Sequence, residues 1–229
     1  MPSKKAVIIS TSQATYPNSN DKTGVWAEEL VAPYYVFTNA GFDVTVASIK
    51  GGQIPVDEAS LQGDFKTADV SRFWGDDSKM QLLKESVALA SISGKEYDIV
   101  FVPGGHGIVF DGPGNKKLAS VLTEAYSSGK VVGAVCHGPA GILEATGPDG
   151  KSIVSSKKCT GFCNTEEEAV GKTDKVPFLL EDRMKALGGK YEKKGDWSDF
   201  CLRDGQLVTG QNPQSSASTA KLCVEASKA

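Results

Sequence analysis

The amino-acid sequence predicts an α/β fold, a mostly parallel sheet with helices on both faces. Four segments rich in β-branched and apolar residues and punctuated by glycine or proline are typical of buried strands. These predicted strands are 6–11, 43–49, 98–103 and 131–135. Helical patterns lie between them, over 23–39, 79–92 and 116–127. Strands that alternate with helices in this way form parallel sheets, whose ligands bind beyond the carboxyl ends of the strands.

The last third of the chain has a more mixed pattern. Its predicted elements are a helix over 178–187, a hairpin that joins 200–202 to 206–209 through Asp204-Gly205, and a helix that Ser215 or Ser216 caps and that continues to about Ala226. The earlier segment 50–78 is polar and shows neither a helical nor a strand-like hydrophobic pattern, so we expect a flap or an inserted segment there. No repeat, low-complexity tract or linker demands a second domain, and we expect one domain over 1–229.

Composition narrows the class of protein. The chain has 229 residues, of which 40% are hydrophobic and 23% charged, as in ordinary globular domains. A net charge of −3 argues against a nucleic-acid partner or an anionic membrane surface. No apolar run approaches the roughly 20 residues that a membrane helix needs. The first residues show no secretory pattern, so the sequence predicts a cytoplasmic protein.

Cysteine and histidine usage limits the possible sites. Five cysteines at irregular spacing fit reduced thiols better than a disulfide framework. Cys159 and Cys163 resemble half of a zinc site, but no second pair lies nearby, so ordinary thiols are favoured. His106 and His137 are the only histidines in the sequence, which rules out a site with three histidine ligands. We expect no metal and no cofactor.

Cys136 stands where a predicted buried strand passes directly into a predicted helix. Such a corner places one side chain in a strained, exposed position at the sheet edge. The small residues Ala134 and Gly138 allow the backbone to turn tightly around it. The helix that follows directs its free N–H groups at the sulfur, which favours the reactive thiolate. The sequence therefore predicts a cysteine nucleophile, in preference to an inert buried cysteine.

The Gly-Gly-His-Gly loop at 104–107 follows the neighbouring predicted strand. Glycines allow backbone N–H groups to approach a ligand closely, and beside a nucleophile such groups form an oxyanion hole. We therefore expect Gly104, Gly105 and His106 to bind the substrate, although a plain turn would also explain the glycines. His137 is expected to act as a base or to supply its backbone N–H to the oxyanion hole.

Two acidic groups are candidates to complete the site. The run Glu166-Glu167-Glu168 could orient the His137 imidazole, although it also suits a solvated helix start. Glu29 falls on the apolar face of the predicted helix 23–39. A carboxylate there is costly unless it is used or paired, and burial raises its pKa toward values that suit proton transfer. A half-buried glutamate that reaches water is an equally good explanation.

These residues together resemble the ThiJ/PfpI superfamily, and within it the heat-shock protein 31-like branch, over nearly the whole chain. The resemblance rests on Thr23-Gly-Val with Glu29, Phe101-Val-Pro-Gly-Gly-His-Gly, Ala134-Val-Cys-His-Gly-Pro-Ala, Thr160-Gly-Phe with the glutamate run, and Leu207-Val-Thr-Gly-Gln-Asn-Pro. It implies a flavodoxin-like three-layer sandwich whose corner is similar to that of class I glutamine amidotransferases. It also implies a nucleophile at Cys136, a triad of this residue with His137 and Glu167, and a helix carboxylate at Glu29.

Members of this branch are glutathione-independent glyoxalases (glyoxalase III, or D-lactate dehydratase, a carbon–oxygen lyase). The resemblance therefore implies that methylglyoxal is converted to lactate, and glyoxal to glycolate, through a cysteine hemithioacetal. A small reactive aldehyde would be the substrate. A stress-induced holdase chaperone, a protein deglycase and a peptidase stay open as alternatives, since the enzymes among them share the nucleophile. Family members are commonly dimers, so we expect a homodimer.

Overall fold

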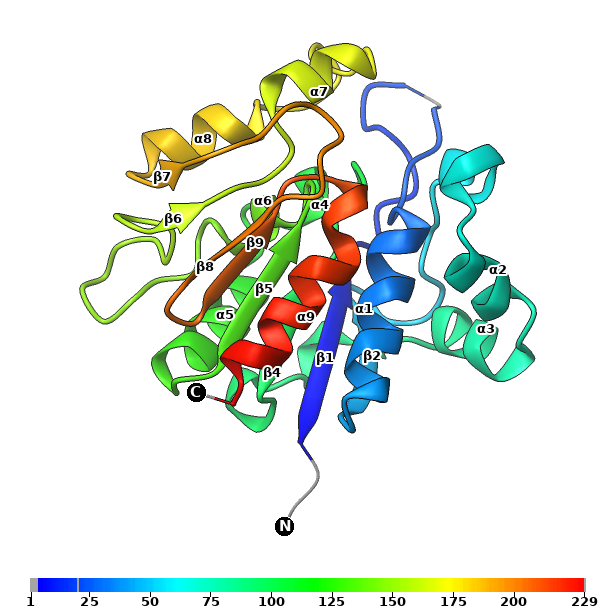
Figure 1. Ribbon diagram of the computed structural model, residues 1–229, viewed down its shortest axis with the longest axis horizontal. Helices are drawn as coiled ribbons and strands as arrows, with labels where there is room; N and C mark the ends of the chain where they lie inside the picture. Colours follow the sequence, from blue (N-terminus) through cyan, green and yellow to red (C-terminus); the bar gives the residue numbers. More distant parts are fainter. Residues whose placement is uncertain (1–3, 20, 229) are drawn as a thin grey trace.

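A seven-stranded sheet forms the centre of the computed structural model, which describes residues 4–19 and 21–228 (Figure 1). Its strands, in spatial order, are β3 (Val87–Ala88), β2 (Asp43–Ser48), β1 (Lys5–Ser10), β4 (Ile99–Val102), β5 (Val131–Val135), β9 (Leu207–Gly210) and β8 (Cys201–Asp204). All neighbours pair in parallel except β8 and β9, which form an antiparallel hairpin. A separate parallel pair consists of β6 (Lys158–Cys159) and β7 (Lys190–Tyr191). The four strands and the hairpin predicted from the sequence are confirmed.

Helices cover both faces of this sheet. In the described residues they are α1 (Ala27–Asn39), α2 (Ala68–Trp74), α3 (Asp77–Lys84), α4 (Ile108–Asp111), α5 (Lys116–Ser127), α6 (Pro139–Ile142), α7 (Asn164–Ala169), α8 (Leu180–Ala186) and α9 (Ser216–Ala226). Helices α1 and α9 pack side by side on the face turned to the viewer in Figure 1, and α5 packs behind β4 and β5. The arrangement is a flavodoxin-like three-layer sandwich, as the sequence predicts.

The helix predicted over 79–92 is wrong in its second half. Helix α3 ends at Lys84, and the chain then extends to form the edge strand β3 and a 3-10 turn at Leu89–Ser91. Val87 pairs with Ala47 of β2, so sheet pairing overrides the local helical pattern. The predicted helix 23–39 also starts late, at Ala27, because the N–H of Val25 bonds the carbonyl of Pro55 instead.

Two further segments differ in detail from their local signals. Helix α9 starts at Ser216, but the Ser215 hydroxyl bonds Phe200 N and Asn212 Oδ1 and does not cap it. The segment 50–78 contains 3-10 turns at Glu58–Leu61 and Gly63–Phe65 and then α2. Although its sequence is mostly polar, it contains apolar side chains that are fully buried, such as Phe73. The segment therefore packs on α1.

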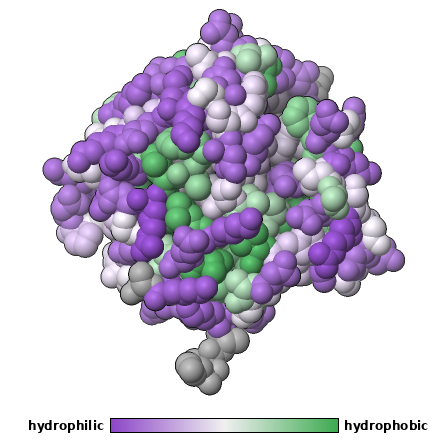
Figure 2. Space-filling view, viewed as in Figure 1, coloured by the Kyte–Doolittle hydropathy of each residue, from purple (hydrophilic) through white to green (hydrophobic). Residues whose placement is uncertain are grey.

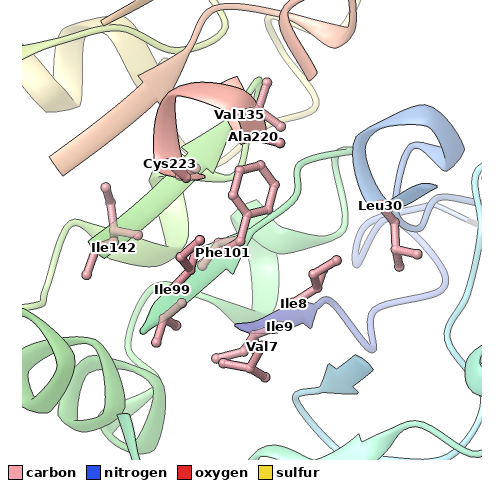
Figure 3. Close-up of a cluster of buried hydrophobic side chains, with 14 of the residues drawn as sticks. Val7, Ile8, Ile9, Leu30, Ile99, Phe101, Val135, Ile142, Ala220 and Cys223 are labelled. Atoms are coloured by element: carbon pink, nitrogen blue, oxygen red, sulfur yellow. The ribbon is translucent and has the colours of Figure 1, made fainter. Parts of the chain in front are cut away.

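The core lies between the sheet and the helix layers. Figure 3 shows the Phe101 ring directed from β4 toward Ala220 and Cys223 of α9, while Val7 and Ile9 lie on the opposite side of the sheet from it. Phe101 is fully buried, and burial of such a side chain is worth about 1.5–3 kcal/mol. This packed centre fixes the ends of β4 and β5, where the loops that carry the predicted site begin.

Two parts of the surface differ: the side of the molecule near β8, and the end where the parallel strands finish. Figure 2 shows hydrophobic residues gathered between the edge strand β8 and helices α9 and α1, with hydrophilic residues around them. The carboxyl ends of the parallel strands point to the upper end of the molecule in Figure 1. Among residues 4–19 and 21–228, no helix is both long enough and apolar enough to cross a bilayer.

Candidate active site

Cys136 occupies the corner between β5 and α6 in a backbone conformation that is rare for a side-chain-bearing residue. Its φ angle is +58°, in the left-handed region, which costs on the order of 1–3 kcal/mol. Hydrogen bonds from Cys136 N to Gly210 O (3.0 Å) and from Phe162 N to Cys136 O (2.8 Å) hold it there. A Cβ on Gly138 would lie 2.1 Å from the Val102 carbonyl oxygen, so the corner needs glycine at that position. The predicted strain at this corner is confirmed, but the predicted exposure is wrong, because the surrounding loops bury Cys136.

The Cys136 residue is only 3% exposed, yet it lines a pocket of about 70 Å³. A cavity needs about 10–15 Å³ of such space to hold one water molecule, so this pocket has room for a molecule several times larger than water. The residues around the pocket are Trp26, Glu29, Phe65, Gly105, His106, Cys136, His137, Phe162, Val170, Trp197, Pro213 and Gln214. One small pocket therefore brings together several segments: the loops after β4 and β5, the start of α1, and the segments next to α7 and α9.

Glu29 reaches this pocket from the first turn of α1. Its side chain is fully buried, and Oε2 accepts a hydrogen bond of 2.7 Å from Gly104 N. The neighbouring Cys136 thiol and the Gly104 N–H both lower the pKa of this carboxyl group, against the larger effect of burial. Oε1 has no hydrogen-bond partner among the described residues. Burial raises the pKa of Glu29 to about 8, so the carboxyl group holds a proton at neutral pH.

The sulfur of Cys136 is less acidic than the corner motif alone predicts. Burial and the adjacent Glu29 carboxylate raise the pKa of the Cys136 thiol well above its ordinary value, although the N–H of His137 opposes them. Helix α6 spans only four residues, so its dipole does not outweigh these effects. The Cys136–Glu29 pair therefore loses its first proton near pH 8 and its second far higher. The remaining proton lies mainly on the sulfur, and its transfer to Glu29 gives the reactive thiolate beside a protonated carboxyl group.

A histidine and a glutamate extend this pair into a triad. His137 Nδ1 lies 3.4 Å from Cys136 Sγ, and His137 Nε2 lies 2.6 Å from Glu167 Oε2. The other oxygen of Glu167 lies 2.7 Å from His106 Nε2. Burial alone would raise the pKa of Glu167, but the charge and hydrogen bonds of the two histidines lower it. The carboxylate is thus ionised and can fix the His137 ring.

The three glutamates of the run are used in three different ways. Glu167 faces His137, whereas Glu168 is exposed. Glu166 is fully buried and faces away from the triad. Its oxygens accept hydrogen bonds from Trp197 N (2.8 Å), Gln211 Nε2 (3.1 Å), Asn212 Nδ2 (2.8 Å) and Cys163 N (3.2 Å). The geometry selects Glu167 as the partner of the imidazole.

His106 has a contact that its loop motif does not indicate. Burial and the neighbouring His137 lower the pKa of His106 to about 4, so the ring is neutral near pH 7. Nε2–H donates to Glu167, and the ring centroids of His106 and His137 are 4.1 Å apart. The sequence predicted a substrate-binding role, and the ring does line the pocket, but its one hydrogen bond goes to the triad carboxylate.

The loop after β4 supplies fewer free N–H groups than the sequence predicts. Gly104 N already donates to Glu29. Gly105 has φ = +82°, and a Cβ there would lie 2.3 Å from the Gly24 carbonyl oxygen, so only glycine fits. The N–H of Gly105 bonds no group among the described residues. Gly105 and His137, which both line the pocket, are therefore the candidate backbone donors to an oxyanion.

Sequence reasoning missed the aromatic walls of the pocket. Trp26 and Phe65 pack edge to face with centroids 5.1 Å apart, and Phe162 and Trp197 lie 5.9 Å apart. These four rings come from four separate segments with no common period. Phe162 within Thr160-Gly-Phe, one of the motifs of the resemblance, was the only local signal.

Two groups of side chains could hold a metal ion. The donor atoms of His106, His137 and Glu167 lie within 4.8 Å of one another, as do those of Cys163, Glu166 and Asp196. In both groups the carboxylates already accept hydrogen bonds from the protein. In the first group, both oxygens of Glu167 are used by the two histidines, so these residues form a hydrogen-bonded cluster.

Known proteins resemble this chain along its whole length. It is 34% identical to "Glyoxalase 3" of Candida albicans, with 95% of each chain covered, and 34% identical to "Glutathione-independent glyoxalase HSP31" of Saccharomyces cerevisiae, with 99% of each covered. The crystal structure of glyoxalase III from Candida albicans matches with a TM-score of 0.89 at 32% identity, covering 97% of both chains. The Rapid Encystment Protein 24 KDa of Francisella tularensis matches with a TM-score of 0.93 at 36% identity, covering 98% of this chain and 99% of the other. The model of the DJ-1/PfpI family matches residues 22–226, and the chain belongs to that family.

Proposed function

We propose that this protein is a glutathione-independent glyoxalase that converts methylglyoxal and water to lactate, and glyoxal and water to glycolate. One observation carries the proposal. A fully buried carboxyl group with one unpartnered oxygen lies against a cysteine sulfur in a pocket of about 70 Å³. A nucleophile and a proton carrier at one small carbonyl-sized site suit an isomerisation between adjacent carbons. Relatives named as glyoxalases support it.

The first step is addition of the sulfur to the aldehyde carbon. The Cys136 thiolate forms a carbon–sulfur bond, and the carbonyl double bond becomes an oxyanion. Backbone N–H groups of Gly105 and His137 stabilise this oxyanion. The protonated Glu29 then gives its proton to the oxygen, which completes the hemithioacetal and leaves Glu29 as a carboxylate.

The second step moves hydrogen between the two substrate carbons. The Glu29 carboxylate takes the proton from the hemithioacetal carbon, which produces an enediolate, and returns it to the neighbouring carbon. The hydroxyl proton passes from the first oxygen to the second. The product is a lactoyl thioester on Cys136, with no net oxidation. The unpartnered Oε1 of Glu29 is the oxygen free for this transfer.

The third step is hydrolysis of the thioester. His137, held by Glu167, takes a proton from water, and the resulting hydroxide adds to the thioester carbonyl. The carbon–sulfur bond breaks, the sulfur takes the proton that His137 accepted, and lactic acid leaves and ionises to lactate in water. The ionised Glu167 stabilises the positive charge that His137 carries during this step.

A peptidase fits the geometry less well, because a pocket of about 70 Å³ does not admit an extended peptide. We also propose that the enzyme acts in the cytoplasm as a homodimer. The five cysteines are all free, which suits a reducing compartment, and the dimer follows from the family resemblance. Size-exclusion chromatography of the purified chain tests the dimer.

The direct test is formation of lactate from methylglyoxal without glutathione, followed by NMR. We expect the wild type and Cys201→Ser, a cysteine outside the pocket, to form lactate at the same rate. Cys136→Ser should form none above the uncatalysed rate. Lactate formation by Cys136→Ser at the wild-type rate, or no lactate from a folded wild type, would falsify the proposal.

A further inference from the structure

The mouth of the active-site pocket is apolar and exposed. Among the described residues, the large hydrophobic side chains that are exposed are Phe65 (48%), Val87 (39%), Val170 (39%) and Trp197 (40%). Three of these four line the pocket of Cys136, and only Val87, on the edge strand β3, lies elsewhere. Single exposed hydrophobic residues need no explanation, but three gathered at one entrance indicate a binding surface. We call Phe65, Val170 and Trp197 the apolar rim.

The rim is held in place at a cost in backbone strain. Trp197 has φ = +63°, a conformation that is a genuine outlier for a bulky residue. Its N–H donates to the buried Glu166, at 2.8 Å, and its ring packs against Phe162. Residues that the surrounding structure holds in such rare backbone conformations are found most often at functional sites. Phe65, another residue of the rim, packs edge to face on Trp26.

A second pocket, of about 140 Å³, adjoins the first and shares Trp26, Phe65, Pro213 and Gln214 with it. Its remaining lining includes the carboxylates of Glu28 and Asp64, and among the residues that the structure describes no lysine or arginine lines either pocket. Room therefore exists beside the catalytic pocket for a substituent larger than methyl. Aromatic walls favour a planar apolar group, and the nearby carboxylates disfavour an anionic one.

We propose that this enzyme prefers 2-oxoaldehydes that carry an uncharged aromatic substituent over those with hydrogen or methyl at that position. The proposal rests on the glyoxalase function proposed above. The oxoaldehyde enters the small pocket and reacts with Cys136, while the ring lies against Trp197 and Phe65. Phenylglyoxal and water would give mandelate through the same addition, hydrogen transfer and hydrolysis, so atoms and electrons balance as they do for methylglyoxal.

The test compares kcat/KM for phenylglyoxal and glyoxal, with mandelate and glycolate measured by chromatography. We expect phenylglyoxal to exceed glyoxal at least tenfold in the wild type. Trp197→Ala and Phe65→Ala should each lower this ratio at least fivefold, and Trp197→Phe, which keeps a ring, should restore most of it. Val87→Ala, an exposed hydrophobic residue of the far edge strand, should leave the ratio unchanged. The charged analogue 4-carboxyphenylglyoxal should react at least tenfold less well than phenylglyoxal.

The outcomes separate this proposal from the one on which it depends. Conversion of glyoxal with no preference for phenylglyoxal, or equal losses for both substrates in Trp197→Ala and Phe65→Ala, would overturn the aromatic preference and leave the glyoxalase function standing. If a folded wild type converts neither compound, the glyoxalase function itself is wrong, and the aromatic preference falls with it.

Discussion

The two sides of the active-site pocket are built differently. The reacting side consists of Cys136 and His137, at the end of β5, with Glu29 and Glu167 beside them. The apolar rim comes instead from a 3-10 turn, a helix end and a loop. The first side is fixed by the sheet and by charged hydrogen bonds, and the second by packing between segments distant in sequence. The chemistry and the choice of substrate can therefore change independently.

Removal of the proton carrier on the reacting side should lower kcat/KM more than any other change. Glu29→Gln keeps the shape of the side chain but cannot carry a proton, so kcat/KM for glyoxal should fall on the order of 10³-fold or more. Glu168→Gln, an exposed glutamate outside the pocket, is the matched control and should retain full activity. Steady-state kinetics measure both. Turnover by Glu29→Gln within tenfold of wild type would assign hydrogen transfer to another group.

Substitutions of the neighbouring residues Glu166 and Glu167 should have clearly different effects, one mainly on stability and the other mainly on kcat. Glu167→Gln should lower kcat by roughly 10²–10⁴-fold, because it withdraws the charge that supports His137. It should cost less stability than Glu166→Gln, because Glu167 accepts two hydrogen bonds and Glu166 accepts four. Glu166→Gln should instead reduce the free energy of unfolding by about 1–3 kcal/mol. The amide keeps the oxygen on which three donors converge, but those bonds lose their charge, and Cys163 N loses its acceptor.

Urea unfolding and glyoxal kinetics, measured on both variants, give the two readouts. The same loss of stability in both variants, or a larger loss of kcat in Glu166→Gln, would contradict this division of roles.

Local signals in the sequence indicated the candidate residues of the reacting side, and the family resemblance chose among the alternatives that they left open. The strand-to-helix corner at Cys136 and the helical-wheel position of Glu29 each depend on residues within one element. The residues alone left the choice among the three glutamates open, and the family resemblance indicated Glu167. The fold shows that this carboxylate is the one that faces His137, at the end of β5. The raised pKa of the Cys136 thiol needed the fold, since burial is a tertiary property. For the same reason no periodicity indicated the rim, and the pairing of Val87 with β2 overrode a helical pattern.

The pH dependence of kcat/KM tests how the reacting side ionises. Attack requires loss of one proton from the Cys136–Glu29 pair, and the raised pKa of Glu29, about 8, sets where that loss occurs. The reactive fraction grows as pH rises, so kcat/KM should increase about tenfold per unit below pH 8 and level off above it. Initial rates from pH 5.5 to 9.5 measure this profile. A plateau already at pH 6 would indicate a thiolate of ordinary low-pKa type.

The smallest expected effect is that of His106, which acts on the substrate only through Glu167. His106→Gln keeps a donor for Glu167 Oε1, whereas His106→Ala removes it and lets the carboxylate rotate away from His137. We expect His106→Ala to lower kcat about tenfold, through slower hydrolysis of the thioester, and His106→Gln to retain most of the activity. Mass spectrometry during turnover should show the acyl-Cys136 adduct accumulating in His106→Ala alone. If that adduct does not accumulate while activity falls, His106 acts before hydrolysis, at substrate binding, as its place in the Gly-Gly-His-Gly loop first suggested.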